Sequence, residues 1–77
     1  MNKFNDVFHA TRRYCLDPDK DPDRDCFQVI SEMAKVPLRN LDFYLNVLRG
    51  LDLVKYSWTQ RTIQLTPTGE MKEKAFA

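Results

Sequence analysis

The sequence predicts one mostly helical α+β domain with the element order helix, helix, helix, strand, strand, helix. Apolar residues recur at helical spacing in three segments before Gly50. Two short segments rich in β-branched and aromatic residues follow, and a Thr-Pro pair then opens a last helical segment. We expect helices at about residues 3–16, 25–35, 37–49 and 67–76, and strands at about residues 53–57 and 62–65.

The first expected helix carries apolar side chains every three or four residues, from Phe4 and Val7 onward. It ends at Asp17, because the residue before a proline avoids the α region and Pro18 follows. The chain then continues as a polar loop to Asp25. We expect this loop to be solvated and to supply a cap for the next helix.

The second and third expected helices are separated by a tight turn at Pro37. Asp25 and Gln28 have the spacing of a capping box at the start of the second helix. Pro37 suits the first turn of the third helix, where its missing N–H costs nothing. Gly50 is placed to end that helix with a left-handed residue. The inner stripe of the third helix is formed by Leu38, Leu41, Leu45 and Leu48.

The two expected strands, residues 53–57 and 62–65, form a hairpin. Residues 58–61 join them without an Asn-Gly or Asp-Gly pair, so a looser loop is expected than a two-residue turn. Thr66 then caps the last helix, and Pro67 occupies its first turn.

The composition restricts the class of protein. The chain has 77 residues, of which 43% are apolar and 30% are charged, as is typical of one small folded domain rather than a disordered segment. No apolar run exceeds three residues, which excludes a membrane span and the core of a signal peptide. We therefore expect a cytoplasmic protein in which Cys15 and Cys26 are buried thiols rather than a disulfide.

The net charge of +1 hides a segregation of charge along the chain. Residues 16–32 carry six acidic side chains against two basic ones, whereas residues 35–61 carry five basic side chains against two acidic ones. The second half of the expected fold is therefore basic, and the loop before the second helix is acidic. A basic surface of this kind favours nucleic acid as a partner.

The element order, with two helices around a tight turn followed by a hairpin, is that of a winged helix-turn-helix domain. Tyr44–Val54 also resembles the end of the recognition helix and the start of the wing in many bacterial and archaeal winged-helix regulators. Ile63–Glu70 is similar to the strand and helix start after the wing in MarR- and PadR-type proteins. The similarity covers about residues 25–76 and departs at Asp52, where these families usually have glycine. It implies a winged-helix fold and a DNA-binding transcriptional regulator.

The outer side of the third helix is the surface that such a fold presents to the major groove of DNA. On a helical wheel, the side opposite the leucines contains Arg39, Asn40, Phe43, Asn46 and Val47. Arginine can bind guanine through two hydrogen bonds, asparagine can bind adenine likewise, and an apolar ring can contact a thymine methyl group. The basic side chains expected near phosphates are Lys35, Arg49, Lys55 and Arg61. We therefore expect double-stranded DNA as the partner, with the third helix in the major groove and the wing on the backbone or in the minor groove.

Several residues leave a second function open. Phe43 with Val47 also fits a protein-binding patch, and Asp42 adds a repulsive charge to any approach by DNA. Trp58 either folds back on the hairpin and closes the core or forms an exposed anchor for a partner or a nucleic-acid sugar. Arg61 either enters a minor groove or is simply solvated. The alternative function is a winged-helix protein–protein interaction module or regulatory subunit that does not bind DNA. A third interpretation is that the outer residues of the third helix are simply solvated positions that bind no partner.

We also expect a homodimer, because a chain this short buries only a thin core by itself. The first and last helices would form the contact, since they carry more apolar bulk than one thin layer needs. The side chains concerned are Phe4, Phe8, Tyr14, Met71 and Phe76.

Patterns for catalysis and metal binding are missing from the sequence. The aspartates of the loop alternate as in the first half of a calcium loop, but position six is Pro22 rather than glycine and position twelve is Gln28 rather than glutamate. His9 stands alone, and GxSxG, HExxH and glycine-rich phosphate loops are absent. We therefore expect no enzyme, no metal site and no cofactor.

Overall fold

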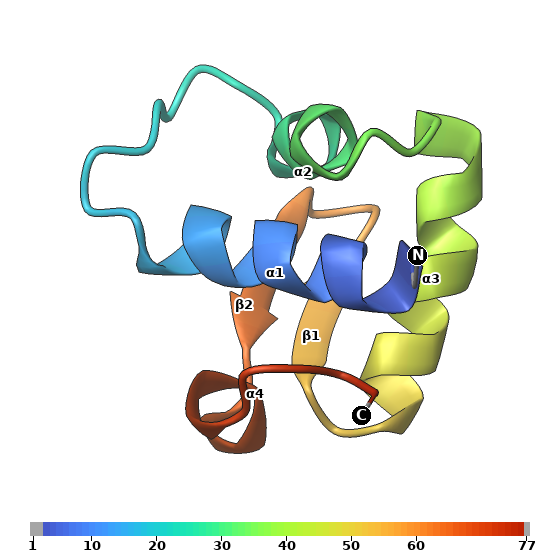
Figure 1. Cartoon of the computed structure of the whole chain (residues 1–77). Coiled ribbons are helices and arrows are strands. Elements are labelled where there is room, and N and C mark those ends of the chain that lie inside the picture. The colour runs from blue at the N-terminus through green and yellow to red at the C-terminus, as the bar shows by residue number, and fades with distance from the viewer. Residues whose placement is uncertain (1–2, 77) are drawn as a thin grey trace.

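The computed structural model describes residues 3–76 of the chain. Its elements are α1 (Lys3–Leu16), α2 (Cys26–Ala34), α3 (Leu38–Gly50), β1 (Val54–Ser57), β2 (Thr62–Leu65) and α4 (Pro67–Met71). Figure 1 shows α1 lying across the hairpin, with α2 above it and α3 upright beside β1. The predicted class is confirmed, since the chain is mostly α with a two-stranded antiparallel hairpin after the third helix. This order is compatible with a winged-helix fold. None of the described helices is long and apolar enough to cross a membrane.

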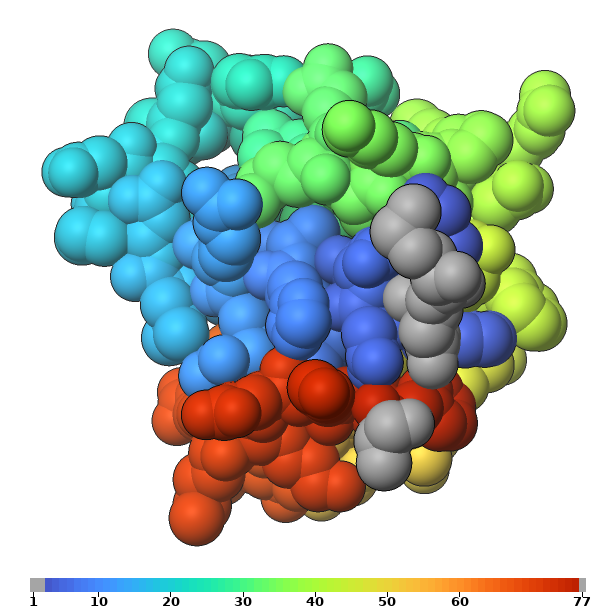
Figure 2. All heavy atoms as spheres, in the orientation of Figure 1, coloured from blue at the N-terminus to red at the C-terminus, as the bar shows by residue number. Residues whose placement is uncertain are grey.

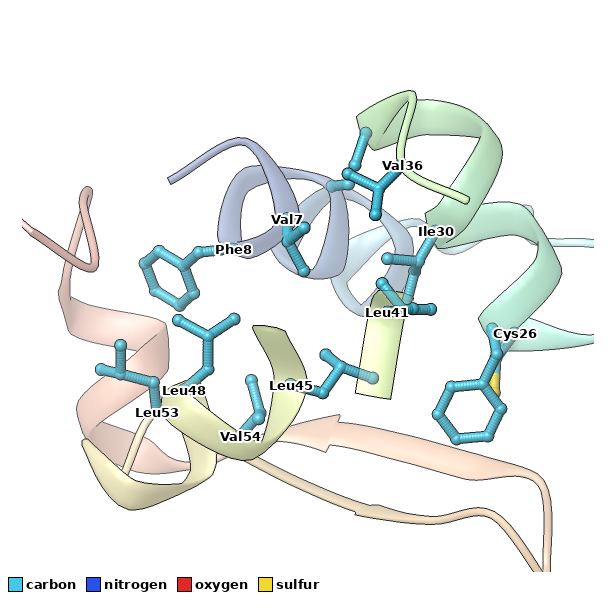
Figure 3. Close-up of a cluster of buried hydrophobic side chains, with 13 residues drawn as sticks. Val7, Phe8, Cys26, Ile30, Val36, Leu41, Leu45, Leu48, Leu53 and Val54 are labelled. Atoms are coloured by element: carbon cyan, nitrogen blue, oxygen red, sulfur yellow. The ribbon is translucent and has the colours of Figure 1, made fainter. Parts of the chain in front are cut away.

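The core lies between the three longer helices and the hairpin. Leu41, Leu45 and Leu48 of α3 are fully buried, as the leucine stripe predicts. Figure 3 shows these leucines together with Phe8 of α1 in one buried cluster. Burial of each such side chain stabilises the fold by about 1.5–3 kcal/mol. Leu38 belongs to the same stripe but is 38% exposed, because it lies in the first turn of α3 at the edge of the core.

The ends of α2 are set by one side chain and one left-handed residue. Asp25 is the N-cap, as predicted, and its carboxylate accepts a hydrogen bond from the Gln28 backbone N–H at 3.1 Å. Lys35 ends the helix with a φ of 57°. Pro37 was expected inside α3 but lies just before it, because its ψ of 140° is extended, and the helix begins at Leu38.

The end of α3 differs from the prediction. Gly50 is the last helical residue rather than a left-handed one, and no described glycine has a positive φ. The left-handed residue is Asp52, with a φ of 61°, at the position where the resembling families usually have glycine. Aspartate tolerates this conformation better than most residues because its short polar side chain can bond locally. The turn is also closed by the Thr66 hydroxyl, which donates to the Asp52 carbonyl.

The hairpin has a regular antiparallel register. Val54 lies opposite Leu65, and Tyr56 lies opposite Ile63. Residues 58–61, called the wing tip below, join the strands as a loop longer than two residues, as predicted. Arg61 closes this loop with a φ of 56°.

The start of α4 agrees with the prediction. Thr66 is the N-cap, its hydroxyl accepts a hydrogen bond from Gly69 N–H at 3.0 Å, and Pro67 occupies the first turn. A glycine is required at position 69, because an added Cβ would lie 2.0 Å from the Leu53 carbonyl oxygen. This close approach places α4 directly on the chain segment that enters β1.

The last helix is shorter than predicted. It ends at Met71, whereas the sequence predicts a helix to about residue 76, and the next residue is already extended. The tail instead lies along α1, where His9 Nε2 is 2.7 Å from the Glu73 carbonyl oxygen. Asn5 exchanges two hydrogen bonds of 3.0 and 2.8 Å with the Phe76 backbone. These bonds satisfy backbone groups of the tail that would be hydrogen-bonded within a longer helix. Contacts with α1 therefore override the local helical pattern.

Candidate nucleic-acid interface

The outer face of α3 is open, as the helical wheel predicts. Arg39, Asn40, Phe43 and Asn46 are exposed, and Val47 is half-buried. Figure 2 shows side chains of α3, in yellow-green, projecting from the right-hand edge of the molecule. The side chains of Arg39 and Asn40 form no hydrogen bond or ion pair with any of residues 3–76. Both are therefore available to a partner.

Phe43 lies on this face with 62% of its surface exposed. Its ring is nevertheless supported, because its centroid is 5.8 Å from that of Phe4 and 5.5 Å from that of Tyr44. Phe4 also packs at 5.1 Å against Tyr44 and at 5.3 Å against Phe76. We call Phe4, Phe43, Tyr44 and Phe76 the aromatic cluster. The sequence analysis missed it because Phe4 and Phe76 lie near opposite ends of the chain, far from Phe43 and Tyr44.

The second half of α3 is tied to the hairpin. The Arg49 guanidinium donates to Asn46 Oδ1 at 2.5 Å and lies 5.2 Å from the centre of the Tyr56 ring. Arg49 and Asn46 were both predicted to face DNA, and the structure brings them together. Arg49 is therefore less free than Arg39.

Trp58 folds back on the domain, which is one of the two interpretations that the sequence leaves open. It is half-buried, and its ring stacks on Phe27 of α2 with centroids 3.9 Å apart and an interplanar angle of 26°. Its Nε1–H donates to Asp42 Oδ1 at 2.6 Å. Asp42, which sequence analysis treats as a repulsive charge, is therefore the acceptor that satisfies the indole N–H.

Arg61 points toward α2. Its guanidinium donates twice to the Asp25 carboxylate, at 2.8 and 2.6 Å, and lies 4.9 Å from the Phe27 ring centre and 5.4 Å from that of Trp58. The hydrogen bonds from Arg61 lower the pKa of Asp25, and the same bonds raise the pKa of Arg61. The wing-tip arginine is thus bound to a side chain of the same domain at the surface, a contact that no local sequence pattern signals.

Two further predicted cations remain free. Lys35, at the turn between α2 and α3, and Lys55, on β1, are both exposed. Neither side chain forms a hydrogen bond or ion pair within the part of the chain that the structure describes. Together with Arg39, they are the unpaired basic residues of the predicted interface.

The acidic loop of residues 17–25 forms local turns. The Asp17 carboxylate accepts a hydrogen bond from Asp19 N–H at 2.8 Å, and Asp21 accepts one from Asp23 N–H at 2.9 Å. Across residues 3–76, no group of three or more histidine, cysteine, aspartate or glutamate side chains is placed to hold a metal ion.

The two cysteines are free thiols beneath β2. Cys26 is buried, and its thiol lies 3.4 Å from the Arg61 carbonyl oxygen. Cys15 is half-buried, 3.8 Å from the Ile63 carbonyl oxygen, and burial raises the pKa of its thiol to about 11. Both therefore behave as packing side chains at neutral pH.

The side chains offered for a dimer contact are mostly used within the chain. Phe8 is fully buried, Phe4 and Phe76 pack in the aromatic cluster, and Tyr14 is half-buried against the core. Met71, by contrast, is 86% exposed. A contact through the first and last helices would therefore be centred on Met71.

No protein-family model, curated protein or solved structure matches this chain.

Proposed function

We propose that the chain is a DNA-binding transcriptional regulator of the winged helix-turn-helix type, with α3 in the major groove. The observation that carries this proposal is the outer face of α3, where Arg39 and Asn40 are exposed and unpaired in the first turn of the helix. The first residues of a recognition helix reach deepest into the groove. Arginine and asparagine are also the side chains best suited to bidentate contacts with purine edges.

The remaining residues of the interface have distinct roles in this proposal. Arg39 reads guanine, Asn40 reads adenine, and the supported Phe43 ring contacts a thymine methyl group. Lys35 and Lys55 contact phosphates on either side of the helix and position the protein without reading sequence. The wing lies on the backbone rather than inserting an arginine into the minor groove, because its arginine is bound to Asp25.

The resemblance of Tyr44–Val54 and Ile63–Glu70 to winged-helix regulators, the latter to MarR- and PadR-type proteins, supports the same role. With that role we propose a cytoplasmic location and a homodimer on a palindromic site. Met71 would form the centre of the contact between the two copies. Sedimentation velocity of the free protein and of a Met71→Lys variant measures this: the variant should shift toward monomer.

Selection of bound sequences from a random duplex pool tests the function. We expect one enriched motif that contains a guanine and an adenine at neighbouring base-pair positions. Titration of the selected duplex should give an affinity that falls with salt, with a log–log slope of about −3 for three to four neutralised phosphates. Failure to enrich a motif, together with no binding at about 50 mM salt, where phosphate contacts are strongest, would contradict the proposal.

A second candidate function is favoured by one specific observation. Phe43 is 62% exposed at the centre of a mixed face, and such a ring also fits a protein-binding surface. Phe43→Ala and Arg39→Ala discriminate the two functions. A co-purified protein partner that is lost with Phe43→Ala but retained with Arg39→Ala supports an interaction module. If Phe43→Ala leaves every complex intact while Arg39→Ala abolishes DNA binding, the interaction module is wrong.

A further inference from the structure

The wing tip is bound to both helices of the helix-turn-helix at once. On one side, Arg61 forms two hydrogen bonds with Asp25, the N-cap of α2. On the other side, the Trp58 indole donates to Asp42 of α3. The Trp58 ring lies between these bonds, stacked on Phe27. The three elements that would meet DNA therefore form one connected unit.

The contacts between α3 and β1 follow a regular geometry. Asp42 and Arg49 are seven residues apart, so they lie two turns apart on one side of α3. Tyr56 of β1 and Trp58, the first residue of the wing tip, both contact side chains of α3. Arg49 lies over Tyr56, and Asp42 accepts the bond from Trp58, so the two chain segments run antiparallel with two matched contacts. The rings of Tyr56 and Trp58 also pack edge to face, 6.2 Å apart.

A carboxylate at position 42 would be unfavourable for DNA binding if it had no other role. A carboxylate there repels phosphates, and an uncharged acceptor would avoid that repulsion. A carboxylate, however, makes a shorter and stronger hydrogen bond than a neutral acceptor, in keeping with the 2.6 Å observed to Trp58. The indole N–H in turn has no other partner among the described residues.

From this geometry we infer that Asp42 is a positioning residue for DNA binding: through its bond to Trp58, it fixes the hairpin relative to α3. The inference depends on the proposed function. The hairpin carries Lys55, and α3 carries Arg39, so this bond sets the spacing between the phosphate contact and the base contact. A hairpin fixed in advance also loses less conformational freedom when DNA binds.

Two substitutions isolate this effect. Asp42→Asn and Asp42→Ala remove the same charge, but only asparagine keeps an oxygen that can accept the Trp58 bond. Both variants should bind DNA without the repulsion between the Asp42 carboxylate and the phosphates. The difference between their DNA affinities therefore reports the hydrogen bond to Trp58. We expect the alanine variant to bind the selected duplex about 3- to 10-fold more weakly than the asparagine variant, the effect of one lost hydrogen bond. Its log–log salt slope should also be smaller in magnitude by about one for each bound copy of the chain, because Lys55 loses its phosphate contact.

Trp58 provides a readout that does not depend on DNA. It is the only tryptophan in the chain, so its fluorescence reports this contact directly. The emission maximum of Asp42→Asn should match that of the wild type, whereas that of Asp42→Ala should shift to longer wavelength. Thermal unfolding of both variants checks that each is folded at the temperature of the titration.

A third variant closes the thermodynamic cycle. Trp58→Phe keeps an aromatic ring on Phe27 but has no N–H to donate. In this background, Asp42→Ala and Asp42→Asn should bind DNA equally, within about 2-fold. The inference is overturned if the two Asp42 variants bind equally when Trp58 is present, or if their difference persists in the phenylalanine background. If the wild-type chain binds no duplex, the proposed function itself fails, and that outcome is distinct from equal binding by the two variants.

Discussion

The acidic loop and the wing tip are both short polar connections, but the structure holds them in different ways. Residues 17–23 of the acidic loop bond mainly to one another and to the adjacent end of α1, through turns such as Asp17–Asp19 and through Lys20, whose amine donates to the Cys15 carbonyl. The end of the loop is held differently, because Arg24 pairs with Glu32 of α2 and Asp25 binds Arg61. Figure 2 shows this loop, in cyan, standing away from the body of the molecule at its left edge. A cavity of about 540 Å³ separates it from α1 and α2.

The wing tip instead bonds to residues far away along the chain. Trp58 reaches α3 across 16 positions, and Arg61 reaches the start of α2 across 36 positions. Long-range bonds of this kind fix a loop relative to the rest of the domain, whereas local turns fix only its own shape. The wing tip is therefore fixed relative to α2 and α3, whereas residues 17–23 of the acidic loop are held mainly by local bonds.

The largest expected difference between the two regions is in stability. Trp58→Ala removes the stacked ring and the bond to Asp42, and we expect it to lower the free energy of unfolding by about 2–4 kcal/mol. Asp19→Ala in the acidic loop should change it by less than about 0.5 kcal/mol, as for most exposed positions. Urea unfolding followed by circular dichroism measures both. Equal losses in the two variants would show that the two connections are held alike.

Asp25 joins the two regions, because it ends the acidic loop and binds the wing tip. Asp25→Ala removes the N-cap of α2, which is worth about 1–2 kcal/mol, and leaves Arg61 without its partner. Asp23→Ala, two residues earlier, is the matched control and should be nearly neutral. Urea midpoints of the two variants measure the difference: similar values would mean that neither the N-cap nor the Asp25–Arg61 pair stabilises the fold.

The same pair predicts a dependence of stability on pH. Hydrogen bonds from Arg61 lower the pKa of Asp25 in the folded state. The ionised Asp25 carboxylate therefore stabilises the fold at pH values above the unfolded-state pKa of about 3.9. This stabilisation is lost as the pH falls below about 4 toward the lower folded-state pKa. Asp25→Asn keeps a capping side chain but cannot titrate.

Urea midpoints of the wild type and Asp25→Asn, measured from pH 7 to pH 3, test this dependence. The stability advantage of the wild type should be constant near neutrality and should shrink below about pH 4. An advantage that stays constant down to pH 3 would contradict the assigned shift.

The smallest expected effect concerns the charge of the acidic loop. Figure 1 places this loop and α3 at opposite ends of a molecule 34 Å long. Charges are screened over about 8 Å at physiological salt, so the double change Asp19→Asn and Asp21→Asn should alter DNA affinity by less than about 2-fold. Fluorescence anisotropy at about 0.15 M salt measures this. A clear gain in affinity would place the loop near the bound DNA.

Features set by local patterns could be predicted from the sequence. The leucine spacing identifies the buried side of α3 and hence its outer face, and Asp25 and Thr66 identify the starts of α2 and α4. Features set by distant contacts could not. The tail leaves the helical conformation because Asn5 and His9 bind it from the other end of the chain.

The candidate site divides in the same way. Arg39 and Phe43 are placed correctly by helix geometry alone, because exposure on a helix follows from its periodicity. Trp58 and Arg61 lie in a loop, where no periodicity indicates which way a side chain points. Their partners, Asp42 and Asp25, become evident only when the packing of the hairpin against both helices is known.

A comparison of two arginines tests most directly whether α3 is the DNA-binding face. Arg39 and Arg13 are both exposed and unpaired within residues 3–76, but Arg13 lies on α1. Alanine at either position removes the same charge. Titrated against the selected duplex, Arg39→Ala should weaken binding by about 1–3 kcal/mol and relax the preference at one base, whereas Arg13→Ala should change affinity by less than about 2-fold. Equal weakening by the two variants, with the base preference retained, would contradict the assignment of α3 as the reading helix.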